Sequence, residues 1–257
     1  MFLEPDEPPA PAVLHPRSDH PLVLLCEHAS NRLPRRLGDL GLREADLGSH
    51  IAWDIGALGV AQRLADRFGA ALVRQAYSRL AVDCNRSLDS PALIAETSAG
   101  IAIPGNRGLG SAERAARIDA IWRPYQDAVH DLLAARKRRG VATLVVAIHS
   151  FTPIYLGTAR PWHVGFLSGG TRWVSEALHA RMGREPGLVS ALDEPYRIEP
   201  DDYSVPMHGD AWGWPSTFVE IRNDLVGDAA GQQAWADRLG DALQATFEAR
   251  PEREDPR

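Results

Sequence analysis

Short apolar runs alternate with segments of helical periodicity along most of this sequence, and few folds accommodate that order. The strongest run is VATLVVAIHS (141–150), in which residues 144–148 are all apolar. Further runs lie at 21–28, 71–78, 163–168 and 216–224. Buried strands separated by helices imply a mostly parallel sheet that is covered on both faces. We therefore expect an α/β fold, a three-layer sandwich with a mixed, mostly parallel sheet between helices.

The segments between these runs predict the helices. Residues 52–70 place most of their apolar side chains on one side, and Gly69 is a typical helix stop. Residues 111–140 predict a long helix that Pro124 should kink or split, because proline removes a backbone donor and crowds the preceding turn. Helices near 171–183 and 230–248 complete the pattern.

The two ends differ in composition from the rest of the chain. The acidic, proline-rich residues 1–18 predict a disordered or extended, loosely draped arm, and residues 251–257 predict a frayed tail. Residues 19–250 are then a single domain. The start lacks the basic and apolar regions of a signal peptide, and no apolar run approaches the ~20 residues of a membrane span. These features favour a cytoplasmic protein with no membrane partner.

Charge and cysteine content exclude further classes. The net charge of −6 argues against a nucleic-acid partner, since phosphate binding favours a basic surface. Cys26 and Cys84 lie in apolar runs and form no Cys-x-x-Cys pair, so we expect buried thiols and no thiolate metal site. The serines do not lie in a Gly-x-Ser-x-Gly elbow, which disfavours a serine hydrolase. The sequence indicates no oligomeric state.

Polar residues follow three of the predicted strands. They are Glu27-His28, His149-Ser150 and Glu220. Ligands of open α/β sheets bind outside the carboxyl ends of the strands, so we expect these side chains to converge on one edge. A catalytic zinc takes about three nitrogen or oxygen ligands and keeps one position open. A single histidine at a strand end is as readily a hydrogen-bonded core residue, but two on adjacent strand ends favour a metal site.

Five segments together carry a family resemblance: LLCEHASNRLP, AWDIGA, YSRLAVDCNR, AIHSF and FVEIRNDL. They resemble the N-formylglutamate amidohydrolase family over residues 21–226, most of the chain. That family is similar in fold to zinc carboxypeptidases, aspartoacylases and zinc-dependent peptidoglycan amidases. The resemblance implies a carboxypeptidase-like fold and a Zn²⁺ cofactor, although sites of this type also accept cobalt, manganese or iron.

The resemblance also implies the metal ligands. His28 resembles the first ligand and His149 the last. In carboxypeptidase-like enzymes a glutamate follows the first histidine by three positions, whereas this chain has Asn31, a poor zinc ligand. Peptidoglycan amidases take their carboxylate from the start of the next helix, so we expect Asp54 as the remaining ligand. The alternatives are Asn31, His50, or an Asp54 that merely stabilises a helix N-terminus.

Substrate-binding residues follow from a second resemblance. Asp83-Cys84-Asn85-Arg86 resembles the Asp-x-Asn-Arg stretch of aspartoacylase-like enzymes, in which the Asn and Arg hold the substrate's carboxylate. A guanidinium can grip a carboxylate through two parallel hydrogen bonds. We expect Arg79 to assist and Asn31 to contact the substrate. The alternative for Arg86 is an ion pair with Asp83 or Asp89.

Catalytic roles are expected near the last strand. Glu220 resembles the catalytic Glu of zinc exopeptidases, a general base that transfers a proton from water to the leaving amine. Arg222 shares its strand face and is expected to orient it, pair with it or bind substrate. The loop 199–215 precedes this strand, and such loops often line active sites. Its His208 and Tyr203 are candidates to stabilise an oxyanion or contact substrate, with a solvent-facing position as the alternative for His208.

These expectations combine into one reaction. The chain is interpreted as a zinc-dependent amidohydrolase that cleaves a small N-acyl amino acid. The resemblance implies N-formyl-L-glutamate as substrate, with formate and glutamate as products. A peptidoglycan or peptide amidase is the alternative enzyme, and a non-catalytic carboxylate-binding protein is the alternative from another class.

Overall fold

The computed structural model describes residues 2–248, and its centre is a seven-stranded sheet of order β1-β3-β2-β6-β11-β9-β10. The strands are β1 (Pro11–Leu14), β2 (Leu22–Cys26), β3 (Ala71–Gln75), β6 (Leu144–Phe151), β9 (Val164–Leu167), β10 (Ser190–Leu192) and β11 (Ser216–Arg222). β3, β2, β6 and β11 run parallel, β1 is antiparallel to β3, and β9 is antiparallel to β11 and parallel to β10. The predicted mixed, mostly parallel sheet is confirmed.

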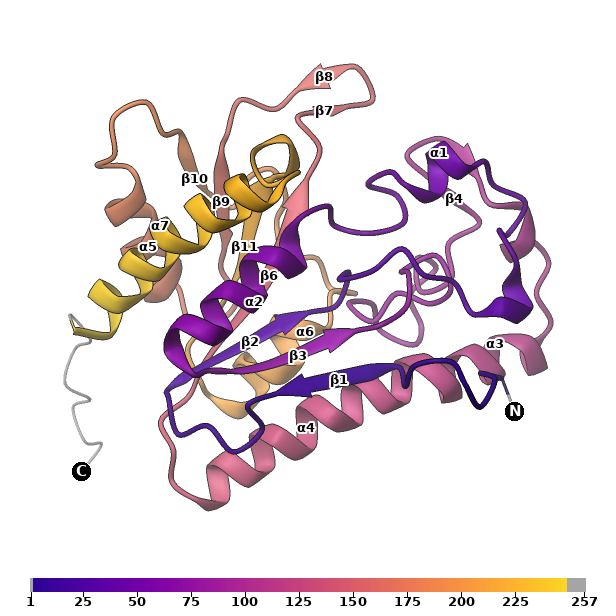
Figure 1. Ribbon diagram of the computed structural model, residues 1–257, viewed down its shortest axis with the longest axis horizontal. Helices are drawn as coiled ribbons and strands as arrows, with labels where there is room; N and C mark the ends of the chain where they lie inside the picture. The colour runs from indigo at the N-terminus through magenta and orange to yellow at the C-terminus, as the bar shows by residue number, and fades with distance from the viewer. Residues whose placement is uncertain (1, 249–257) are drawn as a thin grey trace.

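Helices cover both faces of this sheet (Figure 1). One face carries α2 (Ala57–Phe68), α5 (Trp173–Met182) and α7 (Ala229–Glu248), and the other carries α4 (Arg123–Arg138) and α6 (Ser204–His208). Alternate residues of β2 supply the two cores: Leu24 faces the first set of helices and Leu25 the second. The three-layer prediction is therefore confirmed. Among residues 2–248, no helix has the length and apolar character that crossing a membrane requires.

Short elements complete the description. They are α1 (Glu44–Leu47), α3 (Ser111–Arg117) and the two-stranded pairs β4 (Thr97–Ser98) with β5 (Ile101–Ala102) and β7 (Ile154–Tyr155) with β8 (Thr158–Ala159). The β7–β8 hairpin projects from the carboxyl end of β6 (Figure 1).

The predicted interruption of the long helix is observed. α3 passes into a π-helical turn at Ile118–Trp122, and α4 follows with Pro124 as its second residue. Proline cannot donate to the preceding turn and its ring crowds that turn, so the wider π turn accommodates it. Gly69 ends α2 in the left-handed conformation with φ 56°, as predicted.

Asp54 does not lie on a helix, contrary to the prediction. α2 begins only at Ala57, after Gly56 with φ 80°. A Cβ at Gly56 would lie 2.1 Å from the Val226 carbonyl oxygen, so only glycine fits this close approach. The backbone N–H of Asp54 instead donates to the His28 carbonyl at 3.0 Å. This contact joins the turn that carries Asp54 to the end of β2.

The N-terminal arm is extended but not loosely draped. Residues 11–14 form β1, which closes the open edge of β3, and Phe2 and Ala10 are buried. The Tyr77 hydroxyl donates to the Pro8 carbonyl at 2.7 Å. Composition indicated weak structure, but the apolar PAVL segment pairs with an edge that the sequence alone does not reveal. The predicted tail, residues 251–257, lies outside the described residues.

Candidate active site

Neighbouring strands bring the predicted strand-end residues to one edge of the sheet. β2, β6 and β11 are adjacent and parallel, and Glu220 lies directly beside His149 in the register. His28 follows β2 on the same edge. The predicted convergence is therefore observed, because parallel strands in register end together.

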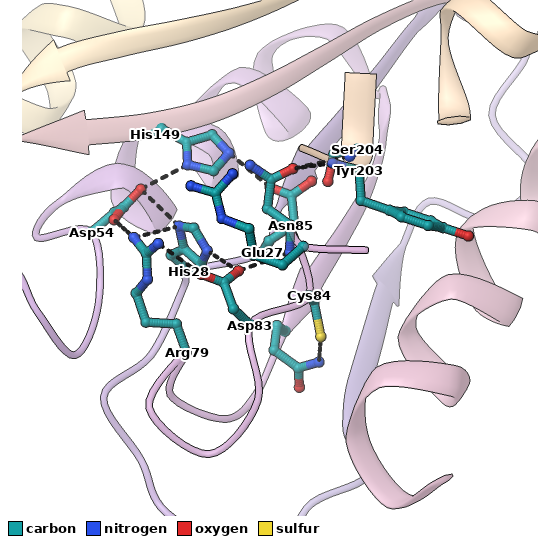
Figure 2. Close-up of polar contacts among 12 residues, drawn as sticks. Glu27, His28, Asp54, Arg79, Asp83, Cys84, Asn85, His149, Tyr203 and Ser204 are labelled. Carbon is teal, nitrogen blue, oxygen red and sulfur yellow. Dashed lines mark hydrogen bonds and ion pairs between the residues drawn. The ribbon is translucent and has the colours of Figure 1, made fainter. Parts of the chain in front are cut away.

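His28, Asp54 and His149 form a buried cluster whose donor atoms all lie within 4.8 Å of one another. The Asp54 carboxylate lies 2.8 Å from His149 Nδ1 and 3.3 Å from His28 Nδ1 (Figure 2). The backbone N–H of Ser150 also donates to Asp54, at 3.3 Å. Both imidazoles thus direct their Nδ1 atom toward the carboxylate of Asp54.

A second carboxylate lies behind each imidazole. His28 Nε2 lies 2.7 Å from Asp83 Oδ1, and His149 Nε2 lies 3.0 Å from Glu27 Oε2. All four side chains are almost completely buried. Such carboxylates orient a histidine ring and leave its other nitrogen free for a metal. Asp83 was expected only as an alternative partner of Arg86 and Glu27 only at the shared sheet edge, although a carboxylate directly before His28 was a signal for this role.

The buried charges stabilise one another. Burial opposes ionisation of Asp54, but the two facing imidazoles outweigh it and hold the pKa of that carboxyl below its usual range. Burial likewise opposes a charge on His149, yet Asp54 and Glu27 raise the pKa of its imidazole well above the usual value. A cation, whether a proton or a metal ion, is therefore favoured between these groups.

A cavity of about 530 Å³ opens beside the cluster. Its walls include the three clustered side chains together with His50, Arg79, Asn85, Arg86, Tyr155, Tyr196, Arg197, Glu199, Asp202 and Glu220. A volume of this order suits a small-molecule ligand. The loop residues Tyr196, Arg197 and Glu199 had no assigned role in the sequence analysis, because their position depends on how the loop packs.

Glu220 presents a carboxylate to this cavity without a neutralising partner. The side chain is 7% exposed, and Oε2 has no hydrogen-bond partner among the described residues. Burial raises the pKa of Glu220 to about 7, with His149 opposing and Asp54 reinforcing the shift. The expected ion pair with Arg222 does not form, because Arg222 Nε donates to Asp224 at 2.8 Å.

Arg79 lies between the cluster and the cavity. Its Nη2 donates to Asp83 at 2.7 Å, and its Nη1 lies 3.3 Å from His28 Nδ1 and 3.8 Å from Asp54 Oδ1 (Figure 2). Its side chain is 28% exposed. The guanidinium is therefore anchored by a buried carboxylate while part of it remains accessible from the cavity.

Asn85 and Arg86 form another part of the cavity wall with the segment 199–204. Asp202 Oδ1 accepts hydrogen bonds from Asn85 Nδ2 at 3.2 Å and from Arg86 Nη1, and Asp201 Oδ1 lies 3.3 Å from the same Nη1. Burial raises the pKa of Asp202 although Arg86 opposes the shift. Arg86 is thus ion-paired, with Asp201 and Asp202 rather than with Asp83 or Asp89.

Four residues expected at the site lie outside the cavity wall. Asn31 is exposed and donates to the Leu47 carbonyl at 3.0 Å. Arg222 pairs with Asp224 at the end of β11. The Tyr203 ring packs edge-on against Trp122, at 5.0 Å between centroids, and points away from the cluster (Figure 2).

His208, the fourth of these residues, lies in the core. It is 4% exposed, and its Nε2 is 2.7 Å from Gln126 Oε1 on α4. Burial lowers the pKa of His208 to about 4, with Glu27 opposing the shift. The loop 199–215 contributes Glu199 and Asp202 to the cavity wall, whereas the part that contains His208 folds into α6 and packs inward.

Comparison with known proteins agrees with this architecture. The family model for N-formylglutamate amidohydrolase matches residues 20–227. The chain is similar to the crystal structure of a gene product from Agrobacterium tumefaciens, with a TM-score of 0.94, 36% identity, and coverage of 97% of this chain and 99% of that one. It also resembles in fold an N-formylglutamate amidohydrolase from Ralstonia eutropha, with a TM-score of 0.73, 21% identity, and coverage of 93% and 97%. No curated protein matches the sequence significantly.

Proposed function

The chain belongs to the N-formylglutamate amidohydrolase family, whose members act on amide C–N bonds, and from this premise we propose that it is a zinc-dependent enzyme that hydrolyses N-formyl-L-glutamate to formate and L-glutamate. The observation that carries the proposal is the buried His28–Asp54–His149 cluster beside the unpartnered carboxylate of Glu220. A metal-ligand set and a candidate base thus line the same small cavity.

The residues fit a divalent metal. Two imidazoles and one carboxylate are a typical ligand set of catalytic zinc sites. Asp83 hydrogen-bonds to the outer nitrogen of His28, Glu27 lies 3.0 Å from that of His149 without hydrogen-bond geometry, and both Nδ1 atoms face Asp54. When bound by these residues, the cation supplies Lewis acidity, which polarises an amide carbonyl and makes water more acidic. Cobalt, manganese or iron are the alternative metals.

Glu220 is proposed to move the proton. Its buried carboxylate has an oxygen with no partner among the described residues, so this oxygen is free to accept a proton from the attacking water. The same group then delivers that proton to the leaving amine nitrogen. A group that first accepts and then donates a proton works best when its two protonation states have similar free energies, which burial of Glu220 promotes.

The two arginines are proposed to bind the substrate. Arg79 lies beside the metal ligands and is partly accessible, so it can donate a hydrogen bond to the amide oxygen as negative charge develops there. Arg86 is 21% exposed and also lines the cavity, where it is proposed to hold the substrate's α-carboxylate. Binding to both arginines is proposed to hold the amide carbon beside the metal ligands and Glu220.

Metal content and formate release test the proposal together. The purified protein should contain close to one zinc per chain, lose activity on chelation and regain it with Zn²⁺. His149→Ala should lose both the metal and N-formyl-L-glutamate hydrolysis while its circular dichroism stays unchanged. Full zinc occupancy in this variant would refute the ligand assignment.

Two further variants identify the remaining ligand. Asp54→Ala should lose the metal, whereas Asn31→Ala should retain it, since Asn31 lies outside the cavity wall. A metal-loaded wild type that hydrolyses no N-formyl amino acid would refute the proposed substrate. A metal-free chain that nonetheless binds L-glutamate would instead support the non-catalytic alternative.

A further inference from the structure

Asp202 lies where Asn85 and Arg86 meet the cavity. A single oxygen of its carboxylate, Oδ1, accepts from both Asn85 Nδ2 and Arg86 Nη1. The other oxygen accepts the backbone N–H of Glu199 at 2.8 Å. The side chain is 11% exposed and forms part of the cavity wall. A carboxylate of the protein itself therefore binds the two residues assigned above to the carboxylate of the substrate.

The Nη1 hydrogens of Arg86 are already in use, whereas its Nη2 makes no hydrogen bond within residues 2–248. A guanidinium Nη1 carries two hydrogens, and Asp201 and Asp202 both lie within reach of the Nη1 of Arg86. The Arg86 Nε is buried and has no partner among residues 2–248. A substrate carboxylate that takes a hydrogen of Nη1 must therefore displace Asp201 or Asp202 from it, and at Asn85 Nδ2 it meets the carboxylate of Asp202.

We infer that Asp202 is a specificity-determining residue that occupies, before substrate binds, the place of the substrate's α-carboxylate on Asn85 and Arg86. This inference rests on the proposed function, which assigns those two residues to the substrate. Binding is then an exchange of one carboxylate for another at the same donors. Only a ligand whose own carboxylate competes with Asp202 gains the full set of contacts.

The surrounding segment is held by several contacts besides those of the Asp202 side chain, whose Oδ2 accepts the backbone N–H of Glu199. The Asp201 carbonyl accepts the backbone N–H of Ser87 at 2.9 Å, and the Asp201 carboxylate accepts the Ser90 hydroxyl. Asn85 Oδ1 accepts the backbone N–H of Ser204, also at 2.9 Å. These contacts hold residues 201–204 against residues 85–90. These contacts remain when Asp202 Oδ1 releases Arg86 or when the side chain is shortened by mutation.

The exchange has a measurable consequence for affinity. In the wild type, the charge-assisted hydrogen bonds that a substrate gains at Arg86 are offset by those that Asp202 loses. Removing the Asp202 carboxylate abolishes this competition, so carboxylate ligands should bind more tightly. A ligand with an α-amide does not need to displace Asp202 in this way, and its affinity should change little.

The test compares the zinc-loaded wild type with Asp202→Ala and Asp202→Asn. For Asp202→Ala we expect the KM for N-formyl-L-glutamate and the inhibition constant of L-glutamate to fall about tenfold, with kcat nearly unchanged. The KM for the α-amide of N-formyl-L-glutamate should stay the same. Asp202→Asn keeps the size of the side chain and a weaker acceptor, so its effect should be intermediate. Thermal unfolding verifies that both variants are folded.

Glu199→Gln is the matched control. Glu199 also lines the cavity, but its side chain makes no hydrogen bond or ion pair with the described residues, so the variant removes a charge without freeing Arg86. If Glu199→Gln lowers KM as much as Asp202→Ala does, the effect arises from general charge repulsion, and the inference is overturned. A rise in KM in the Asp202 variants would make Asp202 a positioning residue for Arg86 and would also overturn it.

The proposed function and this inference can fail separately. If the wild type does not hydrolyse N-formyl-L-glutamate, the proposed function fails. Calorimetric titration of the same variants with L-glutamate still decides whether Asp202 competes for Arg86. Unchanged L-glutamate affinity in Asp202→Ala would then overturn the inference on its own.

Discussion

The two ends of the cavity are built in different ways. At one end, neighbouring parallel strands β2 and β6 position His28 and His149, and the turn before α2 adds Asp54. At the other end, two irregular segments, residues 85–90 and 199–204, hold each other through side-chain contacts. Sheet register determines the first arrangement, whereas the second depends on how two loops pack.

The difference extends to charge. At the strand-built end, each imidazole lies between two carboxylates, and the resulting arrangement favours a cation. At the loop-built end, Arg86 is already paired with the carboxylates of Asp201 and Asp202. The strand-built end is therefore organised for a cation, whereas at the loop-built end an incoming carboxylate competes with the internal partners of Arg86.

The largest expected effect is on kcat, and it comes from Glu220, which lies beside the residues of the strand-built end. Glu220→Gln keeps the size of the side chain but cannot accept a proton, so kcat should fall by about 10²–10⁴-fold. Zinc content, measured by atomic absorption, should stay at the wild-type level, because Glu220 is not proposed as a ligand. Glu199→Gln, at the loop-built end of the same cavity, should change kcat little. A kcat close to the wild-type value in Glu220→Gln would exclude Glu220 as the base.

The next largest effect is expected on zinc affinity, from Asp83 and Glu27, the carboxylates behind the two imidazoles. Asp83→Asn and Glu27→Gln remove the charges that orient His28 and His149, and each should weaken zinc binding by about 10–100-fold. Competition with a chromogenic chelator at fixed pH measures this. Asp89→Asn is the control, since Asp89 is exposed and its carboxylate contacts the Ser87 hydroxyl. Equal zinc affinity in all three variants would contradict the positioning role.

A smaller effect is expected from Arg86→Lys at the loop-built end. Lysine keeps the charge but loses the planar fork, so the KM for N-formyl-L-glutamate should rise by about tenfold. The α-amide of the same substrate should be affected much less, because it offers no carboxylate. Steady-state kinetics on both substrates measures the difference. An equal loss on both would indicate that Arg86 only holds the two loops together.

The smallest expected effect is on the pH dependence of stability, and it comes from His208. This residue ends α6, the helix that follows the loop-built end. Its pKa is lowered to about 4 by burial from an ordinary value of 6.5, with Glu27 opposing the shift and His130 adding to it. Between these two pH values the unfolded chain binds more protons at this residue, so stability falls as the pH falls. From pH 7.5 to 5.5 the wild type should lose about 1 kcal/mol more of its unfolding free energy than His208→Gln.

Urea unfolding of the metal-free proteins at several pH values measures this difference. Both proteins keep every other titratable side chain, so the difference between their pH profiles reports on His208. Parallel pH dependence of the two proteins would show that burial does not lower the pKa of His208.

The strand-built end could be predicted from the sequence because the signals for it lie in short, continuous segments of the chain. Apolar runs that end in Glu27-His28, His149-Ser150 and Glu220 already indicate buried strands with polar ends, and parallel strands must end on a common edge. The same reasoning predicted the layers and the interruption before Pro124. Family resemblance added Asp54 to the expected ligands, although the helix that was supposed to carry it begins later.

Hydrophobic pattern and residue type are local properties, and they were sufficient to predict the class of fold and the sheet edge where the candidate site lies. The partners of these residues depend on tertiary packing. It separated His208 and Tyr203 from the cavity, docked the proline-rich arm on β3, and brought Asp202 to Arg86 across more than a hundred residues of chain. Such pairings depend on how loops pack against a completed sheet, and no periodicity in the sequence records that packing.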